Sequence, residues 1–199
     1  MVYTHKVQQY IESGRYDKDI CSLTQKAKAI VNYEILTNPR AKTVIIDIDE
    51  TLLSNLPYIK EQENLNDVDQ LCAWQRHGLC QPIKPMVDFY LWALKKPVEV
   101  IFITARASDL ADATTDNFNK HHLPVAKIIF RDPIQWPVPK HFKTEQRRLI
   151  SEAGSDIILN IGDQPTDFEG GYWKQALKVP NPFYIESKLP WQKHIDVAA

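Results

Sequence analysis

The sequence predicts an α/β protein with a doubly wound parallel sheet, and three observations support this prediction. Four short apolar runs rich in β-branched residues are typical of strands buried on both faces of a sheet. Helical patterns separate these runs, and strands that alternate with helices form βαβ units. The chain has 199 residues, of which 44% are hydrophobic and 25% charged, a composition typical of one ordinary globular domain.

The first predicted element is a long helix that starts at Asp17 and ends before Pro39. Apolar residues recur at steps of three and four, at positions 20, 23, 27, 30, 31 and 35, which is one apolar helical face. Asp17 is the expected N-cap, and the proline follows the end of the helix. This helix precedes the first strand and forms an N-terminal helical extension of the sheet.

The predicted strands and helices follow in alternation. The strands cover residues 43–46, 98–103, 126–130 and 156–161, and the helices cover residues 87–95, 110–121 and 144–153. Residues 53–85 do not fit this alternation, because they are too many for a plain loop and contain short helical pieces around 58–62 and 68–77. We therefore expect a single domain over residues 1–199, with residues 53–85 as a small inserted cap, called here the cap segment.

Composition excludes some classes of function. The chain has 24 Lys and Arg against 25 Asp and Glu, a formal net charge of −1, so no nucleic-acid polymer is expected as a partner. No run of about eighteen apolar residues occurs, and the N-terminal residues carry charges where a signal peptide needs an apolar segment. We expect a soluble chain without a membrane span, and its oligomeric state stays open.

Two aspartates, Asp47 and Asp49, follow the first predicted strand. Residues two apart on an extended chain point the same way, so both carboxylates project from the carboxyl edge of the sheet, where open α/β sheets bind ligands. Such a pair can bind a hard cation, and one member can act as a nucleophile or an acid. Taken alone, the pair is more often two solvated loop residues.

Asp163 and Asp167 follow the fourth predicted strand in the same manner. Four carboxylates at one edge repel and raise one another's pKa unless a divalent cation neutralises part of their charge. The constellation therefore implies Mg²⁺, which prefers oxygen ligands.

The second predicted strand ends at Thr104, Ala105 and Arg106. They supply a hydroxyl, open backbone N–H groups and a guanidinium before a helix start, and a turn of this kind suits a phosphate oxygen. Lys143 precedes the helix at 144–153 and could add positive charge to the same pocket, although a lone lysine there is usually solvated.

The motifs and their order resemble those of haloacid dehalogenase-like (HAD) phosphohydrolases. The matching pieces are DIDETLLSN at 47–55, IFITAR at 101–106, a lysine before a later helix, and IGDQPTDFEGG at 161–171. YIESGRYDKDI at 10–20 and the continuation to 184 further resemble subfamily IIIB, the class B-like and plant vegetative storage protein-like acid phosphatases. The resemblance extends from about residue 9 to residue 186 and implies a HAD-like, Rossmann-type fold with a small helical cap.

The resemblance also implies an activity. It describes a Mg²⁺-dependent acid phosphatase that hydrolyses small organic phosphomonoesters, nucleotides among them, through an aspartyl-phosphate. It makes Asp47 the nucleophile and Asp49 first the general acid and then the base. Mg²⁺ would be held by the Asp47 carboxylate, the Asp49 backbone carbonyl and Asp163, with Asp167 orienting the metal-bound waters.

The resemblance places Thr104 and Lys143 on the phosphoryl oxygens. Lys143 has competitors in Lys140, Arg147 and Arg148, although the run HFKTEQRR aligns with the lysine of the family. In the cap segment, Asn55 is a candidate hydrogen-bond partner of the leaving group. Tyr58 and Trp74 could stack on a nucleoside or aryl group, or could simply hold the cap down.

Other functions and sites stay open. A phosphotransferase would use the same site, and a non-catalytic storage or binding protein would use the same fold. Cys72, His77 and Cys80 offer three zinc ligands at an untypical spacing without a clear fourth, which disfavours zinc. A disulfide between Cys72 and Cys80 would be compatible with export. The resemblance favours a periplasmic or secreted setting, and a cytoplasmic one follows if the chain as given is full length.

Overall fold

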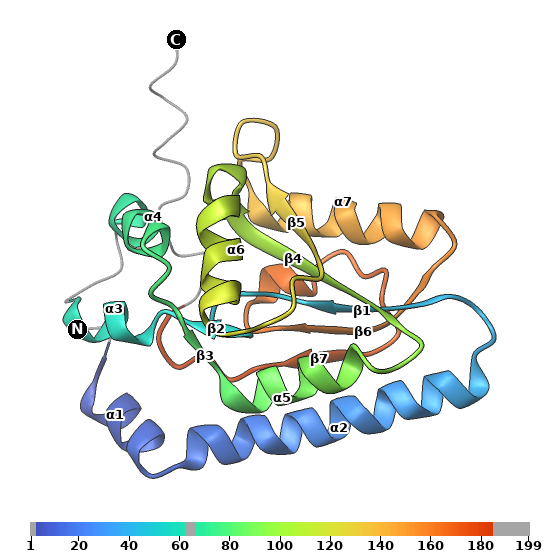
Figure 1. Ribbon diagram of the computed structural model, residues 1–199, viewed down its shortest axis with the longest axis horizontal. Helices are drawn as coiled ribbons and strands as arrows, with labels where there is room; N and C mark the ends of the chain where they lie inside the picture. Colours follow the sequence, from blue (N-terminus) through green and yellow to red (C-terminus); the bar gives the residue numbers. More distant parts are fainter. Residues whose placement is uncertain (1–2, 63–66, 185–199) are drawn as a thin grey trace.

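The computed structural model describes residues 3–62 and 67–184, and Figure 1 shows its architecture. Residues 63–66 of the cap segment, and residues 185 and 186 at the end of the expected resemblance, lie outside the described part. None of the helices formed by the described residues is long and apolar enough to cross a membrane.

The core of the protein is a five-stranded sheet of order β5-β4-β1-β6-β7, with every neighbouring pair parallel. The strands are β1 (Lys42–Ile46), β4 (Glu99–Ala107), β5 (Lys127–Arg131), β6 (Asp156–Gly162) and β7 (Ala176–Lys178). The predicted parallel α/β sheet is confirmed. The edge strand β7 was not predicted, because its three residues are too few to show a strand pattern.

Helices cover both faces of the sheet. The described helices outside the cap segment are α1 (His5–Glu12), α2 (Arg15–Thr37), α5 (Lys84–Ala93), α6 (Ala111–Lys120) and α7 (Pro139–Glu152), together with the 3₁₀ turns η1 (Ser108–Leu110) and η2 (Pro165–Asp167). Figure 1 shows α2 and α5 along one side of the sheet and α7 along the other. The result is a three-layer α/β/α arrangement, which is the doubly wound fold that the sequence predicts.

The prediction that Asp17 caps the long helix is wrong. Helix α2 begins at Arg15, and its N-cap is Gly14, which has a φ of 73°. Glycine adopts this left-handed conformation at little cost, so the break between α1 and α2 falls at Gly14. Asp17 lies in the first turn of α2 instead, where its charge favours the helix dipole.

Side chains alternate between the two faces of the sheet. Val44, Ile46 and Phe102 belong to the cluster that includes residues of α2, α5 and α6. Ile45 and Ile101 pack with residues of α7 on the opposite face. Both faces of β1 and β4 are therefore buried, as the continuous apolar runs of a parallel sheet require.

The segment at 53–85, predicted to be a cap, follows β1. It contains β2 (Leu53–Ser54), α3 (Leu56–Glu61), α4 (Val68–Arg76) and β3 (Gln81–Pro82), and β2 pairs with β3 antiparallel. Helices α3 and α4 match the short helical pieces expected there, whereas two-residue strands leave no pattern to read. Helix α4 packs against α6 and η1. Because η1 follows the end of β4, α4 lies beside the carboxyl edge of the sheet.

Phe102 tests the packing of the α2–α5–α6 face. Its fully buried ring meets Tyr90 at 5.0 Å and Phe118 at 5.4 Å between ring centroids, both edge-on. We expect Phe102→Ala to lower the free energy of unfolding by about 3–5 kcal/mol, because it loses apolar burial and leaves a cavity. Urea denaturation measures this loss. Leu36→Ala, at a side chain that is 85% exposed, is the control, and an equal loss in both variants would contradict the packing.

Candidate active site

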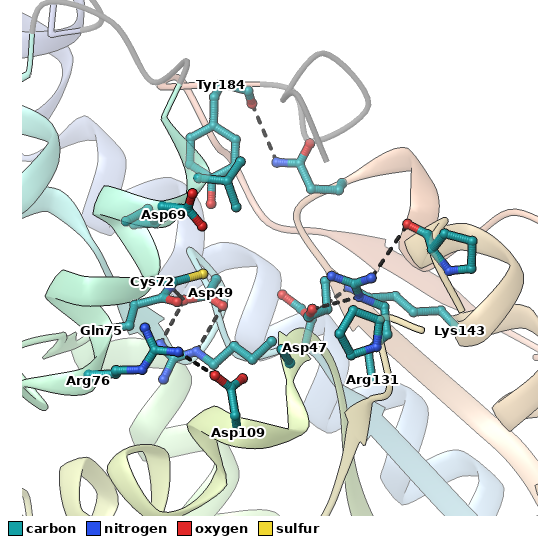
Figure 2. A pocket seen from close by; sticks show the side chains of 18 of the residues that line it. Asp47, Asp49, Asp69, Cys72, Gln75, Arg76, Asp109, Arg131, Lys143 and Tyr184 are labelled. Carbon is teal, nitrogen blue, oxygen red and sulfur yellow. Dashed lines mark hydrogen bonds and ion pairs between the residues drawn. The ribbon is translucent and has the colours of Figure 1, made fainter. Parts of the chain in front are cut away.

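A cavity of about 530 Å³ opens at the carboxyl edge of the sheet. Figure 2 shows that Asp47 and Lys143 lie on one side of it, while Asp49, Cys72 and Gln75 lie on the other. The cavity forms where β1, β4 and β6 end, because parallel strands bring their carboxyl ends to one edge. Asp47 reaches it directly after β1, where its backbone N–H donates to the carbonyl of Ile161 in β6.

Three buried carboxylates lie close together in the floor of the site, and one ammonium group is bonded to two of them. One oxygen each of Asp47, Asp163 and Asp167 lies within 4.8 Å of the others. The Nζ atom of Lys143 donates to Oδ1 of Asp47 at 2.9 Å and to Oδ1 of Asp167 at 2.5 Å. The structure thus brings together the nucleophile candidate, two metal-ligand candidates and the candidate lysine.

The competitors of Lys143 lie elsewhere. Lys140 pairs with Glu169 at the surface, and Arg148 pairs with two glutamates of its own helix. Arg147 is buried, but its guanidinium donates to the backbone carbonyls of residues 167, 169 and 171. Arg147 therefore supports the loop that carries Asp167. Of the four candidates, Lys143 is the one that donates to the carboxylates of Asp47 and Asp167.

The charge balance of this cluster fits a hard divalent cation. Burial raises the pKa of Asp47 well above its usual range, and the charge of Lys143 opposes that rise. Burial, followed by repulsion from Asp167, also raises the pKa of Asp163. Burial is the main cause of both shifts, and repulsion among the carboxylates adds to it. When ionised, the three carboxylates carry negative charge in excess of what one lysine neutralises. Carboxylate oxygens are hard ligands, and a divalent cation held by them would offset the excess.

Asp163 is held in place by several donors. Its Oδ1 accepts from the Thr51 hydroxyl at 3.3 Å, and its Oδ2 accepts from the Asn181 amide at 2.6 Å and from the Gln164 amide. The backbone N–H of Gln164 in turn donates to Oδ2 of Asp167 at 2.8 Å. This capping of η2 orients both carboxylates toward the cluster.

Asp49 is bound by a different cation. Arg106 donates to it in a fork, from Nε to Oδ2 at 3.0 Å and from Nη2 to Oδ1 at 2.7 Å. Asn55 and Gln75 also donate to Oδ1, at 2.9 and 3.0 Å. Burial alone would raise the pKa of Asp49, but the charge and hydrogen bonds of Arg106, with the bond from Asn55, outweigh it and lower that pKa.

The residues predicted to form a phosphate-binding turn lie in a strand. Strand β4 continues through Ala107, so Thr104, Ala105 and Arg106 belong to the strand and not to a turn. Ala105 and Arg106 line the cavity. Thr104 is fully buried, and its Oγ1 accepts from the backbone N–H of Arg106 at 3.2 Å. The pairing of β4 with β5 is irregular after Ile103, and the sequence pattern does not reveal this extension.

The three cap candidates for the leaving group, Asn55, Tyr58 and Trp74, are not among the residues that line the cavity. The Asn55 amide is buried, where it donates to Asp49 and Glu50. Tyr58 packs 5.7 Å from Trp74 between ring centroids, in a buried cluster with Leu71. Tyr58 therefore holds α3 and α4 together, which is the alternative that the sequence left open for the cap aromatics.

The cysteines form no disulfide in the described residues. Cys72 lines the cavity, whereas Cys80 is buried and accepts from Nη2 of Arg106 at 3.2 Å. Burial raises the pKa of each thiol to about 11. His77 is the C-cap residue of α4. In the part of the chain that the structure describes, the metal-ligand geometry occurs at the aspartates and not at these residues.

Sequence reasoning missed several residues of the site. Glu50 is buried with a φ of 51° and accepts from the Asn55 backbone at 2.6 Å and from the Tyr184 hydroxyl. Burial, reinforced by the charge of Asp49, raises the pKa of Glu50 to about 7. Its place inside the first motif was the one available signal. Gln75 belongs to no motif, and Asn181 lies in the matching stretch that ends at residue 184, where nothing local marks it as a partner of Asp163.

The outer cavity lies between α4 and the segment that joins β5 to α7. Its apolar walls are formed by Val68, Leu71, Pro133, Ile134 and Pro137. Arg131 fixes the joining segment, since its buried guanidinium donates to the carbonyls of residues 105 and 136. An ion pair between Arg76 and Asp109 links α4 to η1. The space above the aspartates is therefore large enough for an organic group and mostly apolar.

Comparison with known proteins agrees with this geometry. Residues 2–187 match the family model of the HAD superfamily, subfamily IIIB (acid phosphatase). The chain is 28% identical over 189 residues to acid phosphatase 1 of Solanum lycopersicum, covering 89% of this chain and 72% of that protein. It is 27% identical over 180 residues to vegetative storage protein 1 of Arabidopsis thaliana, covering 87% and 66%.

A solved structure shows the same fold. The class C acid phosphatase from Bacillus anthracis with tungstate bound superposes with a TM-score of 0.73 at 21% identity, covering 88% of this chain and 82% of that one. The parallel sheet with its edge of aspartates and the family match over most of the chain lead to one conclusion. The chain belongs to the HAD superfamily, subfamily IIIB, the acid phosphatases, and it is a phosphomonoesterase.

Proposed function

We propose that this chain hydrolyses small organic phosphomonoesters through an aspartyl-phosphate on Asp47, with Mg²⁺ as the metal. The observation that carries the proposal is the position of Asp47, a buried carboxylate in the floor of the cavity that is bonded to Lys143 and flanked by Asp163 and Asp167. This is a nucleophile beside positive charge and metal ligands, which phosphoryl transfer requires.

The chemistry proceeds in two steps. A carboxylate oxygen of Asp47 forms a bond to phosphorus while the bond from phosphorus to the leaving oxygen breaks, and Asp49 gives that oxygen its proton. Water then attacks the phosphorus and loses its proton to Asp49, which releases inorganic phosphate and the free Asp47 carboxylate. Asp49 lies on the opposite side of the cavity from Lys143 (Figure 2), as a group that serves the leaving oxygen should.

The remaining polar groups position the phosphoryl group. Lys143 holds Asp47 and can also bind a phosphoryl oxygen, and Thr104 stays a predicted contact. Asp47, Asp163 and the Asp49 backbone carbonyl would hold Mg²⁺, with Asp167 orienting its waters. When bound, Mg²⁺ supplies positive charge that offsets the approach of the phosphoryl oxygens to Asp47.

The cavity supports a broad range of leaving groups. Its volume of about 530 Å³ is much more than a phosphate needs and falls within the range of small-molecule sites. The apolar walls from α4 and from residues 133–137 suit an aryl or nucleoside group, so nucleotides are included in the proposal. An added alcohol would reveal transfer in place of hydrolysis if a phosphorylated alcohol formed.

The nucleophile is tested by Asp47→Asn. We expect turnover of 4-nitrophenyl phosphate with Mg²⁺ to fall by more than about a thousandfold, because the amide cannot form the phosphoryl bond. Rapid-quench labelling should detect a phosphorylated enzyme in the wild type and none in the variant. Asp116→Asn, at an exposed position of α6, is the matched control and should keep full activity. Substantial turnover by Asp47→Asn would refute the mechanism, and an inactive wild type would favour a storage or binding protein.

The metal site is tested by Asp163→Asn. Mg²⁺ that binds only the folded protein raises its melting temperature, so the wild type should melt at a higher temperature with added Mg²⁺ than with EDTA. We expect Asp163→Asn to lose most of this shift, because one anionic ligand is gone. Asp88→Asn, at an exposed residue of α5, should keep it. Equal shifts in both variants would place the metal elsewhere.

Gly162 tests how closely η2 approaches the end of β6. A Cβ at this position would lie 2.2 Å from Oδ2 of Asp167, and the carboxylate cannot yield easily because Lys143 and the Gln164 backbone hold it. We expect Gly162→Ala to lower kcat by about tenfold or more through displacement of this carboxylate. Gly154→Ala introduces a strained φ without any such contact. It should lower the melting temperature but leave kcat near the wild-type value, and equal kcat in both variants would contradict the prediction.

A further inference from the structure

We propose that Gln75 of α4 is a positioning residue for Asp49, which it holds in place for proton transfer to and from the leaving group. The inference rests on the proposed role of Asp49 as general acid and base. Figure 2 shows the Gln75 side chain extending from α4 to Asp49. The residue is 4% exposed, and no motif of the sequence includes it.

The orientation of the Gln75 amide follows from its two partners. Its Nε2 lies 3.0 Å from Oδ1 of Asp49 and 3.3 Å from Oδ1 of Asn55. Asn55 must present its oxygen there, because its own Nδ2 donates to Asp49 and to Glu50 at 2.9 Å each. Both partners of Gln75 are thus acceptors, so the NH₂ group of its amide faces them.

The two carboxylate oxygens of Asp49 accept different numbers of hydrogen bonds. Oδ1 accepts from Arg106, Asn55 and Gln75, whereas Oδ2 accepts from Nε of Arg106. A carboxylate oxygen offers two lone pairs in its plane, so the three donors saturate Oδ1. A proton that moves between Asp49 and the leaving group is therefore carried by Oδ2.

Gln75 is the contribution of α4 to this arrangement. Arg106 comes from β4, and Asn55 precedes α3, but Gln75 comes from the helix whose neighbouring residues Leu71, Cys72 and Arg76 line the outer cavity. The same helix thus borders the space for the leaving group and holds the acid that serves it. Without the Gln75 amide, Arg106 and Asn55 still donate to Oδ1, but the donor from α4 is lost, and the carboxylate should shift away from the leaving group.

The experiment compares substrates that differ in how much they need the acid. The leaving group of 4-nitrophenyl phosphate departs without a proton, whereas an alkyl phosphate needs one. With the Mg²⁺-loaded enzyme, we measure kcat/KM for a series of aryl and alkyl phosphates of rising leaving-group basicity. We expect Gln75→Leu to lower kcat/KM for the alkyl phosphates by about tenfold or more beyond its effect on 4-nitrophenyl phosphate. Gln70→Leu, at an exposed residue of the same helix, should parallel the wild type.

The outcomes distinguish a failure of the role inferred for Gln75 from a failure of the role proposed for Asp49. In Asp49→Asn, kcat/KM should fall with rising leaving-group basicity at least as steeply as in Gln75→Leu. If Asp49→Asn steepens the dependence and Gln75→Leu lowers all substrates equally, Gln75 is merely structural and the inference is wrong. If Asp49→Asn shows the wild-type dependence, the proposed role of Asp49 fails. Gln75→Asn keeps the amide but shortens its reach, so it gives the same test if the leucine variant does not fold.

Discussion

The ion pairs of Lys143 with Asp47 and Asp167 are the interaction on which the site depends. They join the end of β1, the η2 turn and α7, so three segments distant in sequence meet at one buried ammonium group. Carboxylates repel strongly away from water, and each needs a partner to remain charged. The supporting contacts, such as the guanidinium of Arg147 under the η2 loop, hold these segments in place.

The two aspartates of the first motif form ion pairs with different cations. Asp47 meets Lys143, and burial raises its pKa, whereas Asp49 meets the fork of Arg106, which lowers its pKa. Two identical side chains two residues apart thus have opposite environments, because different groups pack around each of them. Both residues follow β1, but the difference between their environments is produced by Arg106 of β4 and Lys143 of α7.

Much of this architecture is predictable because its signals are local. The apolar runs at 43–46 and 156–161 become β1 and β6, and their neighbouring carboxyl ends bring Asp47 and Asp163 together. The cap helices are also predictable from short periodic pieces. By contrast, β7, the two-residue strands of the cap segment and the extension of β4 past Ile103 carry no local pattern, since pairing partners decide them.

The sequence by itself determined the parallel α/β fold, the order of the motifs and the aspartates at the sheet edge, because strand periodicity and motif spacing are properties of contiguous residues. Only the tertiary structure decided what each side chain touches. It brings Arg106 to Asp49, Gln75 to the same carboxylate from 26 residues away, and Tyr184 to Glu50 across 134 residues. It also packs Tyr58 against Trp74 within the cap. Long-range contacts of this kind depend on how helices pack on the sheet, and no local pattern encodes them.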